Sequence, residues 1–546
     1  MAIISFDTKD LQAANGGKRG LTDVITDMGV EIEEATKQEI KVNIDPNRPD
    51  LLDFTGMHRA IANFTGKKKP QDNRYKISNA PAMTITVQAA VKKARPYIAG
   101  IVVKNADLTG HKLKYFINFT EKFSDTYGRK RKKLAIGVHS LAAINGSLTY
   151  TAEGSGSITP LGLGKPMRFD KLMKEHIKGI TYQDAVPTFG KSYLYPLLKD
   201  DSKTIALIPV TNCEETKVTE NTKELFIDIT STSDVALGNA AAVIACSFID
   251  SGADVYPVEI AYGKAKKATP MLEYREIKLS MSTAERTLGV ATGRHNIISL
   301  ANRMGHTAAK YGSSVLFYVP PYRVDVLNEQ DIIEDIAIAY GYNNIEPIAI
   351  LGTSSGMSND SADSDNRIAL TMVGLGYTEA INSLLTSEEV SFTKMGWKPL
   401  KESYVSIADS KTSAITMLRQ SLLPGLLQNI AASANATMPQ RLFEVGKTFH
   451  VKAGKPIEGK GIAFVSVHSK ANFAEIKSAV EALFKQTGTD YRIEEHRDAA
   501  FMQGRCARVV SKGRQAALFG EVHPETISNF RIEEPVVAAE ISLDDL

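Results

Sequence analysis

The stretch Pro321-Tyr-Arg-Val-Asp-Val-Leu-Asn-Glu-Gln-Asp-Ile-Ile-Glu-Asp-Ile-Ala-Ile-Ala-Tyr-Gly-Tyr342 carries the densest pattern in this 546-residue sequence. It predicts a short strand, a turn at 327–328 and then a helix. Asn328 can cap that helix, and Asp331, three residues later, completes a capping-box pattern. Apolar residues at helical spacing predict a buried helix face: Ile332, Ile333, Ile336, Ala337 and Tyr340.

The same stretch concentrates four carboxylates near the start of the predicted helix. Asp331, Glu334 and Asp335 lie at i, i+3 and i+4 and so share the polar face, while Asp325 closes the preceding predicted strand. One interpretation is a solvated acidic face, because the helix dipole favours acidic residues in a first turn. The other is a site for a hard cation such as Mg²⁺, which prefers carboxylate oxygens and retained waters. Spacing alone leaves both interpretations open.

The pattern Tyr-Arg-x-Asp-x5-Asp-x2-Glu-Asp-Ile-Ala-x3-Gly-Tyr resembles the signature of the B5 domain in the beta-subunit family of phenylalanyl-tRNA synthetase. Asp335 stands where the family usually has a second Glu, and either carboxylate can act as a ligand. The resemblance implies that Asp325, Asp331, Glu334 and Asp335 bind Mg²⁺ at the contact with an alpha subunit.

Length and composition set broader limits. A chain of this length predicts three to four domains at about 150 residues each, and its hydrophobic content of 43% is enough for several cores. The net charge of +3 does not by itself indicate nucleic-acid binding. Cys213, Cys246 and Cys506 form neither a zinc spacing nor a disulfide framework, which indicates a reducing compartment. No leader segment or long apolar run is evident, so we expect a cytoplasmic protein without a membrane partner.

Residues 1–82 are expected to form a small α/β domain. Asn47-Arg-Pro-Asp-Leu-Leu52 predicts an extended turn and a helix capped by Asp50, and it resembles the start of the same beta subunit. Lys67 belongs to a basic run at 67–69, for which a solvated turn is the ordinary interpretation. The resemblance also allows Lys67 to approach the pocket of the neighbouring domain.

Residues 83–265 alternate short β-branched runs with helical segments and predict a mixed α/β domain. Asp228 and Thr230 alternate with apolar residues and so share one face of a strand. Polar residues at the predicted strand ends are His139, Asn212, Glu214, Asp228 and Thr230. Taken singly, His139 is ordinarily interpreted as a histidine whose hydrogen bonds are satisfied within the fold. Asp228 and Thr230 are ordinarily interpreted as a hydrogen-bonded strand edge.

Three motifs of this domain together resemble the B3/B4 editing domain of the same family. They are Arg129-Lys-Arg-Lys-Lys-Leu-Ala-Ile-Gly-Val-His139, Pro209-Val-Thr-Asn-Cys-Glu-Glu-Thr-Lys-Val-Thr219 and Phe226-Ile-Asp-Ile-Thr230. Cys213 stands where the family often has Ser, which leaves its role open. The basic run 129–133 has two interpretations, a contact with tRNA phosphate and a solvated loop.

The editing resemblance implies hydrolysis of mischarged tyrosyl-tRNA. A pocket shaped for phenylalanine rejects an analogue that merely adds a hydroxyl only about 10²-fold, so a second site is needed. Glu214 is expected to accept the tyrosine hydroxyl, while His139, Asn212, Asp228 and Thr230 position the ester and its attacking water. Because no Ser-His-Asp arrangement is evident, we favour water over a covalent intermediate.

Residues 268–347 are expected to form the B5 domain, and a polar linker at 352–359 leads to a final α/β region, 360–546. That region resembles the B6/B7 region, a class II synthetase-like antiparallel-sheet core that has lost its catalytic residues. Arg419 and Arg441 are accordingly interpreted as structural or interfacial. The expected fold class is therefore multidomain α/β.

The motifs occur in the order expected for this family, and the short length, without an added OB domain or C-terminal RNA-binding domain, resembles its archaeal and eukaryotic cytosolic type. Such a beta subunit works with an alpha subunit as an α2β2 enzyme, which binds ATP on alpha and attaches phenylalanine to tRNA(Phe). Two other interpretations stay open: a free-standing editing hydrolase that needs no alpha subunit, and a non-catalytic RNA-binding protein built from the same domains.

Overall fold

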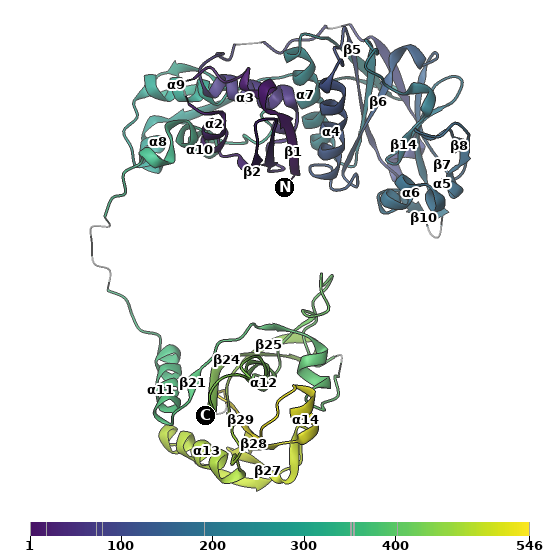
Figure 1. The fold of residues 1–546 in the computed structure, drawn as a ribbon. Coiled ribbons are helices and arrows are strands. Elements are labelled where there is room, and N and C mark those ends of the chain that lie inside the picture. The colour runs from purple at the N-terminus through teal and green to yellow at the C-terminus, as the bar shows by residue number, and fades with distance from the viewer. Residues whose placement is uncertain are drawn as a thin grey trace. The chain divides into compact units, whose positions relative to one another are not determined.

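The chain forms two compact units, residues 1–349 and 350–546 (Figure 1). The computed structural model describes residues 2–17, 19–71, 74–78, 80–189, 192–349, 352, 355–400 and 402–544. Within these ranges, no helix combines the length and the apolar character that crossing a membrane requires. The division between the units falls in the interval between the third and fourth predicted domains.

A three-stranded antiparallel sheet of order β1–β3–β2 opens the first unit. Its elements are β1 (Ala2–Asp7), β2 (Glu31–Ala35), β3 (Glu39–Ile44), α1 (Thr8–Gln12), α2 (Leu21–Asp27) and α3 (Phe54–Phe64). The cap of α3 differs from the prediction, because Pro49–Leu52 forms a separate 3₁₀ turn. Asp53 therefore caps α3 by accepting from the Gly56 N–H, while Asp50 binds Arg48.

A ten-stranded mixed sheet occupies the middle of the first unit, in the order β14–β13–β12–β7–β4–β16–β5–β15–β6 with β17 added beside β16. Its strands are β4 (Met83–Val87), β5 (Tyr97–Lys104), β6 (Leu134–Ser140), β7 (Leu148–Glu153), β12 (Tyr195–Lys199), β13 (Thr204–Leu207), β14 (Thr211–Asn212), β15 (Leu225–Ser231), β16 (Asp254–Tyr262) and β17 (Ala265–Thr269). The sheet thus continues to residue 269, beyond the predicted boundary at 265, because β17 pairs with β16.

Side-chain alternation divides the middle sheet into two buried faces. On β5, Ala99, Ile101 and Val103 pack toward α4 and α7, whereas Ile98 and Val102 join a second core on the other face. The accompanying helices are α4 (His111–Asp125), α5 (Phe169–Glu175), α6 (Ile177–Tyr182) and α7 (Asp234–Asp250) (Figure 1). Two short hairpins complete the region: β8 (Ser157–Ile158) with β9 (Met167–Arg168), and β10 (Thr188–Phe189) with β11 (Ser192–Tyr193).

The middle sheet curls until its two end strands, β14 and β6, face each other. Among the described residues, no backbone ladder joins these two strands. Side chains cross between them instead: Asn212 Nδ2 donates to the Val138 carbonyl at 3.1 Å, and Arg131 Nη1 donates to the Pro209 carbonyl at 3.0 Å. We call this junction of β6 with β14 and the preceding segment 208–210 the seam.

The third part of the first unit is a sheet of order β18–β20–β19 with three helices. Its elements are β18 (Arg275–Ser280), β19 (Thr307–Tyr311), β20 (Ser314–Val319), α8 (Met281–Leu288), α9 (Arg294–Arg303) and α10 (Glu329–Tyr340). The predicted capping box of Asn328 and Asp331 on α10 is confirmed. The strand before it ends at Val319 rather than at Asp325, because Pro320 and Pro321 lack the N–H that a ladder needs.

A buried carboxylate ties the three parts of the first unit together. Asp250, at the C-terminal end of α7, accepts from Arg59 Nη1 at 2.6 Å, Arg74 Nε at 2.8 Å and the Tyr75 hydroxyl at 2.9 Å. The Arg59 guanidinium also lies 3.5 Å from the centroid of the Tyr322 ring. A carboxylate at a helix C-terminus is disfavoured by the helix dipole, so the two arginines are needed to hold Asp250 ionised, and they keep its pKa below the usual range despite burial.

A seven-stranded sheet organises the second unit, in the order β21–β24–β25–β29–β28–β27–β26. All its ladders are antiparallel except that of β21 with β24. The elements are β21 (Thr378–Glu379), β24 (Gln440–Lys452), β25 (Lys455–Val467), β26 (Arg492–Glu495), β27 (Phe501–Ser511), β28 (Arg514–Val522), β29 (Val536–Ser542), the hairpin of β22 (Leu385–Thr386) with β23 (Met417–Leu418), and helices α11 (Asp360–Gly374), α12 (Leu423–Ala432), α13 (Phe473–Thr487) and α14 (Pro524–Asn529). Arg419 pairs with Glu444, and Arg441 pairs with Glu475, so both arginines are engaged within this unit.

Replacing Asp250 by Asn is expected to destabilise the first unit by about 3–5 kcal/mol, because Arg59 and Arg74 lose the carboxylate that they share and the buried Arg59 keeps only Asp50, at 3.6 Å. Urea denaturation of the full chain, followed by near-ultraviolet circular dichroism, measures this loss. Asp234→Asn is the matched control, since Asp234 begins the same helix but forms only an exposed pair with Lys267, expected to contribute less than about 1 kcal/mol. Equal effects of the two substitutions would contradict the role given to Asp250.

Candidate active site

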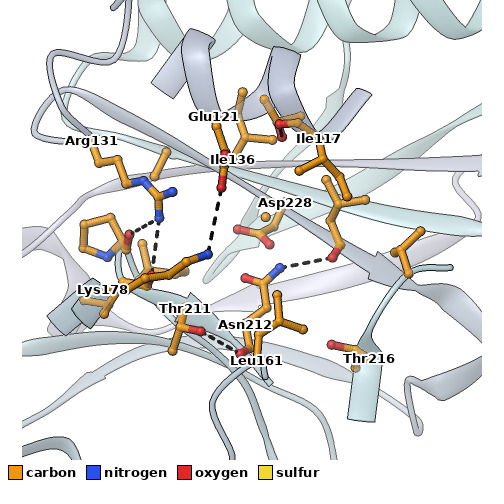
Figure 2. Close-up of a pocket in the computed structure, with 18 of the residues that line it drawn as sticks. Ile117, Glu121, Arg131, Ile136, Leu161, Lys178, Thr211, Asn212, Thr216 and Asp228 are labelled. Atoms are coloured by element: carbon orange, nitrogen blue, oxygen red, sulfur yellow. Dashed lines mark hydrogen bonds and ion pairs between the residues drawn. The ribbon is translucent and has the colours of Figure 1, made fainter. Parts of the chain in front are cut away.

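A cavity of about 200 Å³ opens at the seam (Figure 2). Its wall comes from α4, β6, β15, the segments 207–212 and 216–218, and the single residues Arg131, Leu161 and Lys178. Apolar side chains form much of that wall: Leu113, Phe116, Ile117, Ile136, Val138, Leu161, Leu207, Ile208, Val210 and Val218. Since an apolar cavity of about 150 Å³ holds benzene, this cavity can accept an aromatic ring.

Asp228 and Thr230 reach the cavity from β15, as their alternation along the strand predicts. Asp228 pairs with Gly137 of the neighbouring strand β6. A Cβ atom at Gly137 would lie 2.1 Å from Asp228 Oδ1 and 3.2 Å from Asn212 Oδ1. Glycine at this position therefore lets the carboxylate and the amide converge over the same point of β6.

His139 holds Asp228 from behind the cavity wall. The imidazole is fully buried within β6, with Nε2 2.9 Å from Asp228 Oδ1 and Nδ1 2.8 Å from the Thr216 hydroxyl. Asp228 Oδ2 has no hydrogen-bond partner among the described residues. One carboxylate oxygen is thus fixed by the histidine, and the other remains available to a ligand or a water molecule.

A buried arginine supports the same strand. Arg95 Nε donates to the Thr230 hydroxyl at 3.0 Å, and Arg95 Nη2 donates to the Thr230 carbonyl at 3.1 Å. Burial lowers the pKa of Arg95 to about 10, so the guanidinium stays protonated at neutral pH. Sequence reasoning missed Arg95, which carries no periodic signal, whereas Gly137 and Thr216 stood inside the quoted motifs without a role of their own.

Glu214 does not line the cavity, so the structure does not bring it together with Asn212, Asp228 and Thr230. Its carboxylate accepts from the Gly162 N–H at 2.6 Å and pairs with Lys217 at 3.3 Å. The Gly162 hydrogen bond lowers the pKa of Glu214 below its usual value. These contacts fix the carboxylate beside the cavity wall, while the acceptors within that wall include Glu121, Asn212 and Asp228.

Two further residues from the sequence analysis lie apart from the cavity. Lys67 donates to the Ala13 carbonyl, a contact inside the first part of the chain. Cys213 is buried, and burial raises the pKa of its thiol. Its sulfur lies 3.3 Å from the Thr216 hydroxyl, so it packs behind His139 rather than facing the cavity.

The acidic stretch around α10 is occupied by interactions within the chain. Arg323 is buried, and its guanidinium donates to both Asp325 and Asp335 at 2.7 Å. His306 Nε2 lies 2.6 Å from Asp335 Oδ2. Although burial alone would raise them, Arg323 holds the pKa values of Asp325 and Asp335 below their usual range.

The other two predicted metal ligands do not converge with this pair. Asp331 Oδ2 accepts from the N–H groups of Leu327 and Asn328 as part of the capping box, and Glu334 is exposed. Within the described part of the chain, no group of three or more His, Cys, Asp or Glu side chains is arranged to hold a metal ion. The four carboxylates therefore do not fit a Mg²⁺ site inside this chain by itself.

Comparisons with known proteins agree with the order of these parts. A family profile described as "tRNA synthetase B5 domain" matches residues 277–342, and one described as "Phenylalanyl tRNA synthetase beta chain CLM domain" matches residues 349–543. A phenylalanine–tRNA ligase beta subunit from Archaeoglobus fulgidus is 34% identical over 548 residues, which cover all of this chain and 98% of the relative. The chain belongs to the phenylalanine–tRNA ligase beta-subunit family.

A second relative and a solved structure also match this chain. A beta subunit from Methanosphaera stadtmanae is 31% identical over 565 residues, covering 100% of both chains. The crystal structure of an N-terminal fragment of the phenylalanyl-tRNA synthetase beta subunit from Pyrococcus horikoshii matches with a TM-score of 0.58 and 25% identity, over 62% of this chain and 99% of the fragment. The family membership expected from the motifs is thereby confirmed.

Replacing Thr216 by Val is expected to lower the free energy of unfolding by about 1–3 kcal/mol, because His139 Nδ1 is left buried without a partner. Equilibrium urea denaturation measures the change. Thr86→Val, at an exposed position of β4, is the control and should stay within about 0.5 kcal/mol of the parent. An unchanged stability in Thr216→Val would show that Thr216 does not hold the histidine.

Removing divalent cations with a chelator is expected to leave the unfolding temperature of the isolated chain unchanged, because Asp325 and Asp335 are already paired with Arg323. Differential scanning fluorimetry with and without chelator tests this. A fall in the unfolding temperature that added Mg²⁺ restores, and that Asp331→Ala with Glu334→Ala abolishes, would establish the metal site in this chain.

Proposed function

We propose that this chain is the beta subunit of a phenylalanine–tRNA ligase and that its seam cavity hydrolyses mischarged tyrosyl-tRNA. The observation that carries the proposal is Asp228. Its Oδ1 is held by His139, and its unpartnered Oδ2 belongs to a side chain in the wall of a cavity that can accept an aromatic ring. This arrangement supports a domain of the B3/B4 editing type.

The chemistry proposed for the cavity is ester hydrolysis by water. Asp228 Oδ2 accepts a proton from the water, whose oxygen forms a bond to the ester carbonyl carbon. The bond from that carbon to the ribose oxygen then breaks, and the ribose oxygen takes the proton. The products are free tyrosine and uncharged tRNA. Asn212 and Thr230 flank Asp228 in the wall and orient the ester.

The described residues favour water over a protein nucleophile. Cys213 is buried, and its raised pKa disfavours the thiolate that an attacking cysteine needs. The Thr230 hydroxyl accepts from Arg95, and Thr216 is bound to His139. The hydroxyl that His139 contacts belongs to Thr216, which is only 1% exposed and also donates to the Cys213 carbonyl at 3.3 Å, so it is held within the fold rather than freed for attack.

An editing site gives the whole enzyme a selectivity that its synthetic pocket lacks. An apolar pocket for phenylalanine discriminates against tyrosine by only about 10²-fold, which is too little for accurate translation. A separate hydrolytic cavity acts on the product after transfer to tRNA. Because Glu214 lies outside the wall, we assign the recognition of the tyrosine hydroxyl to the hydrogen-bond acceptors within the wall rather than to Glu214.

The rest of the chain supports the subunit role. We assign the antiparallel sheet of the second unit to a class II synthetase-like core without activity, since Arg419 and Arg441 are both paired with carboxylates. Large apolar side chains stay exposed on this unit, among them Leu370 (70%), Val373 (55%) and Ile381 (89%). We assign these side chains to the contact with the alpha subunit of an α2β2 enzyme that charges tRNA(Phe) with phenylalanine at the expense of ATP.

Replacing Asp228 by Asn in the assembled enzyme is expected to slow deacylation of tyrosyl-tRNA(Phe) by at least about 10²-fold, because the general base is lost. The rate of charging with phenylalanine should not change. Release of radiolabelled tyrosine and phenylalanylation of tRNA measure the two activities.

Glu214→Gln is the matched control for this experiment. It also removes one carboxylate beside the seam, but one held by Gly162 and Lys217, so deacylation should continue at the parent rate. Full deacylation by Asp228→Asn would contradict the proposed function. Loss of deacylation in Glu214→Gln alone would return the hydroxyl-binding role to Glu214.

A further inference from the structure

Arg131 and Lys178 are neighbouring cations in the wall of the seam cavity, and the carboxylate that pairs with Lys178 is the half-exposed Glu121. Arg131 Nη1 donates to the carbonyls of Pro209 and Val210, and its guanidinium lies 3.9 Å from the centroid of the Tyr182 ring. Its Nε is buried without a hydrogen-bond partner among the described residues. These partners fix Arg131 in position, but none of them is a carboxylate that would neutralise it.

The backbone that carries Arg131 is held in an unusual conformation. Arg129, Lys130 and Arg131 have consecutive positive φ values of 53°, 50° and 64°. Residues with long side chains rarely adopt this left-handed region, and three in succession cost free energy. The Lys130 and Arg131 N–H groups bond the carbonyls at the end of α4, at 2.8 and 2.9 Å, and so hold the loop in place. The fold therefore maintains a strained loop that directs Arg131 to the seam.

Lys178 is the second cation. It lies near the start of α6, and its pKa is lowered by burial and by the nearby charge of Arg131. The carboxylate that approaches it, Glu121, stays 4.0 Å away with half of its side chain exposed to solvent. Two like charges that repel each other at the wall of one cavity are stabilised when an anion lies between them.

We propose that Arg131 and Lys178 form an anion subsite that binds the phosphodiester next to the terminal nucleoside of the aminoacyl-tRNA. The inference rests on the proposed function, because it is the ester of that nucleoside that Asp228 hydrolyses. Figure 2 shows both cations on one side of the cavity, beside Asp228 and Asn212. The subsite holds the nucleotide while the aminoacyl group occupies the apolar part of the wall.

The chemistry of the substrate leaves one candidate for this subsite. The carboxyl group of the amino acid is consumed in the ester, and its α-amino group is cationic, so Arg131 and Lys178 repel it. The hydroxyls of ribose and of tyrosine are neutral at physiological pH. The phosphodiester is thus the anionic group that the substrate can offer, and arginine suits it because its planar fork matches phosphate oxygens.

Comparing two small substrates distinguishes loss of a phosphate contact from a general loss of hydrolysis. One is the tyrosyl ester of adenosine, which has no phosphate, and the other is the tyrosyl ester of the trinucleotide cytidylyl-cytidylyl-adenosine. With Lys178→Met in the full chain, KM for the trinucleotide ester should rise about tenfold. The slope of log KM against log salt concentration should fall by about 1, since one phosphate contact is lost. Both kcat and KM for the adenosine ester should stay unchanged.

Lys174→Met is the matched control, because Lys174 is an exposed lysine on the neighbouring helix α5 and lies outside the cavity wall. It should change neither kcat nor KM for either ester. Equal effects of Lys178→Met on both esters, or an equal loss in Lys174→Met, would overturn the subsite.

If the chain hydrolyses neither ester, the proposed function is contradicted. The anion subsite can still be tested separately by a binding measurement. Isothermal titration calorimetry of the full chain should show tighter binding of adenosine 5′-monophosphate than of adenosine. Lys178→Met and Arg131→Gln should each remove that difference while leaving adenosine binding unchanged. Equal affinity of the parent chain for the two ligands would overturn the inference.

Discussion

The arrangement of the first unit depends on how its middle sheet ends. An unpaired strand edge exposes N–H and C=O groups that must find partners, and a full ladder between β6 and β14 would close the sheet and fill its interior with side chains. Here the two edges face each other without a ladder among the described residues. Asn212 and Arg131 satisfy carbonyls across the seam, and the space left between the edges becomes the cavity.

The position of Asp228 follows from that constraint. A carboxylate in the middle of a buried strand is costly unless it is hydrogen-bonded, and His139 from the adjacent strand supplies one bond. Glycine at 137 removes the side chain that would otherwise occupy the space over β6. Burial, a fixed first oxygen and an open second oxygen are together what a general base at an ester requires.

The sequence predicted the structure best where the signal was a spacing pattern within one strand or one helix. Alternation along one strand placed Asp228 and Thr230 on the same face, and the capping box at Asn328 formed as its spacing predicts. The contacts of Glu214 depend on Gly162, which is distant in sequence, so its motif neighbours gave no sign of its orientation. The same limit hid Arg95, which reaches Thr230 from the segment just before β5. At α10 the spacing predicted the helix and its capping box correctly. The role of Asp335 depends on its pairing with Arg323, which spacing alone does not reveal.

Two arginines show how the surroundings separate a structural from a ligand-binding role. Arg323 is saturated by the carboxylates of Asp325 and Asp335, so it stabilises the fold and leaves no anion site. Arg131 binds only carbonyls and a ring, and it stands in a cavity wall beside Lys178. A crystal structure of the assembled enzyme with a non-hydrolysable amide analogue of tyrosyl-adenosine tests the central claim most directly. The account predicts the tyrosine ring in the seam cavity and the amide carbonyl carbon next to Asp228 Oδ2; an analogue bound elsewhere, with the seam cavity empty, would contradict it.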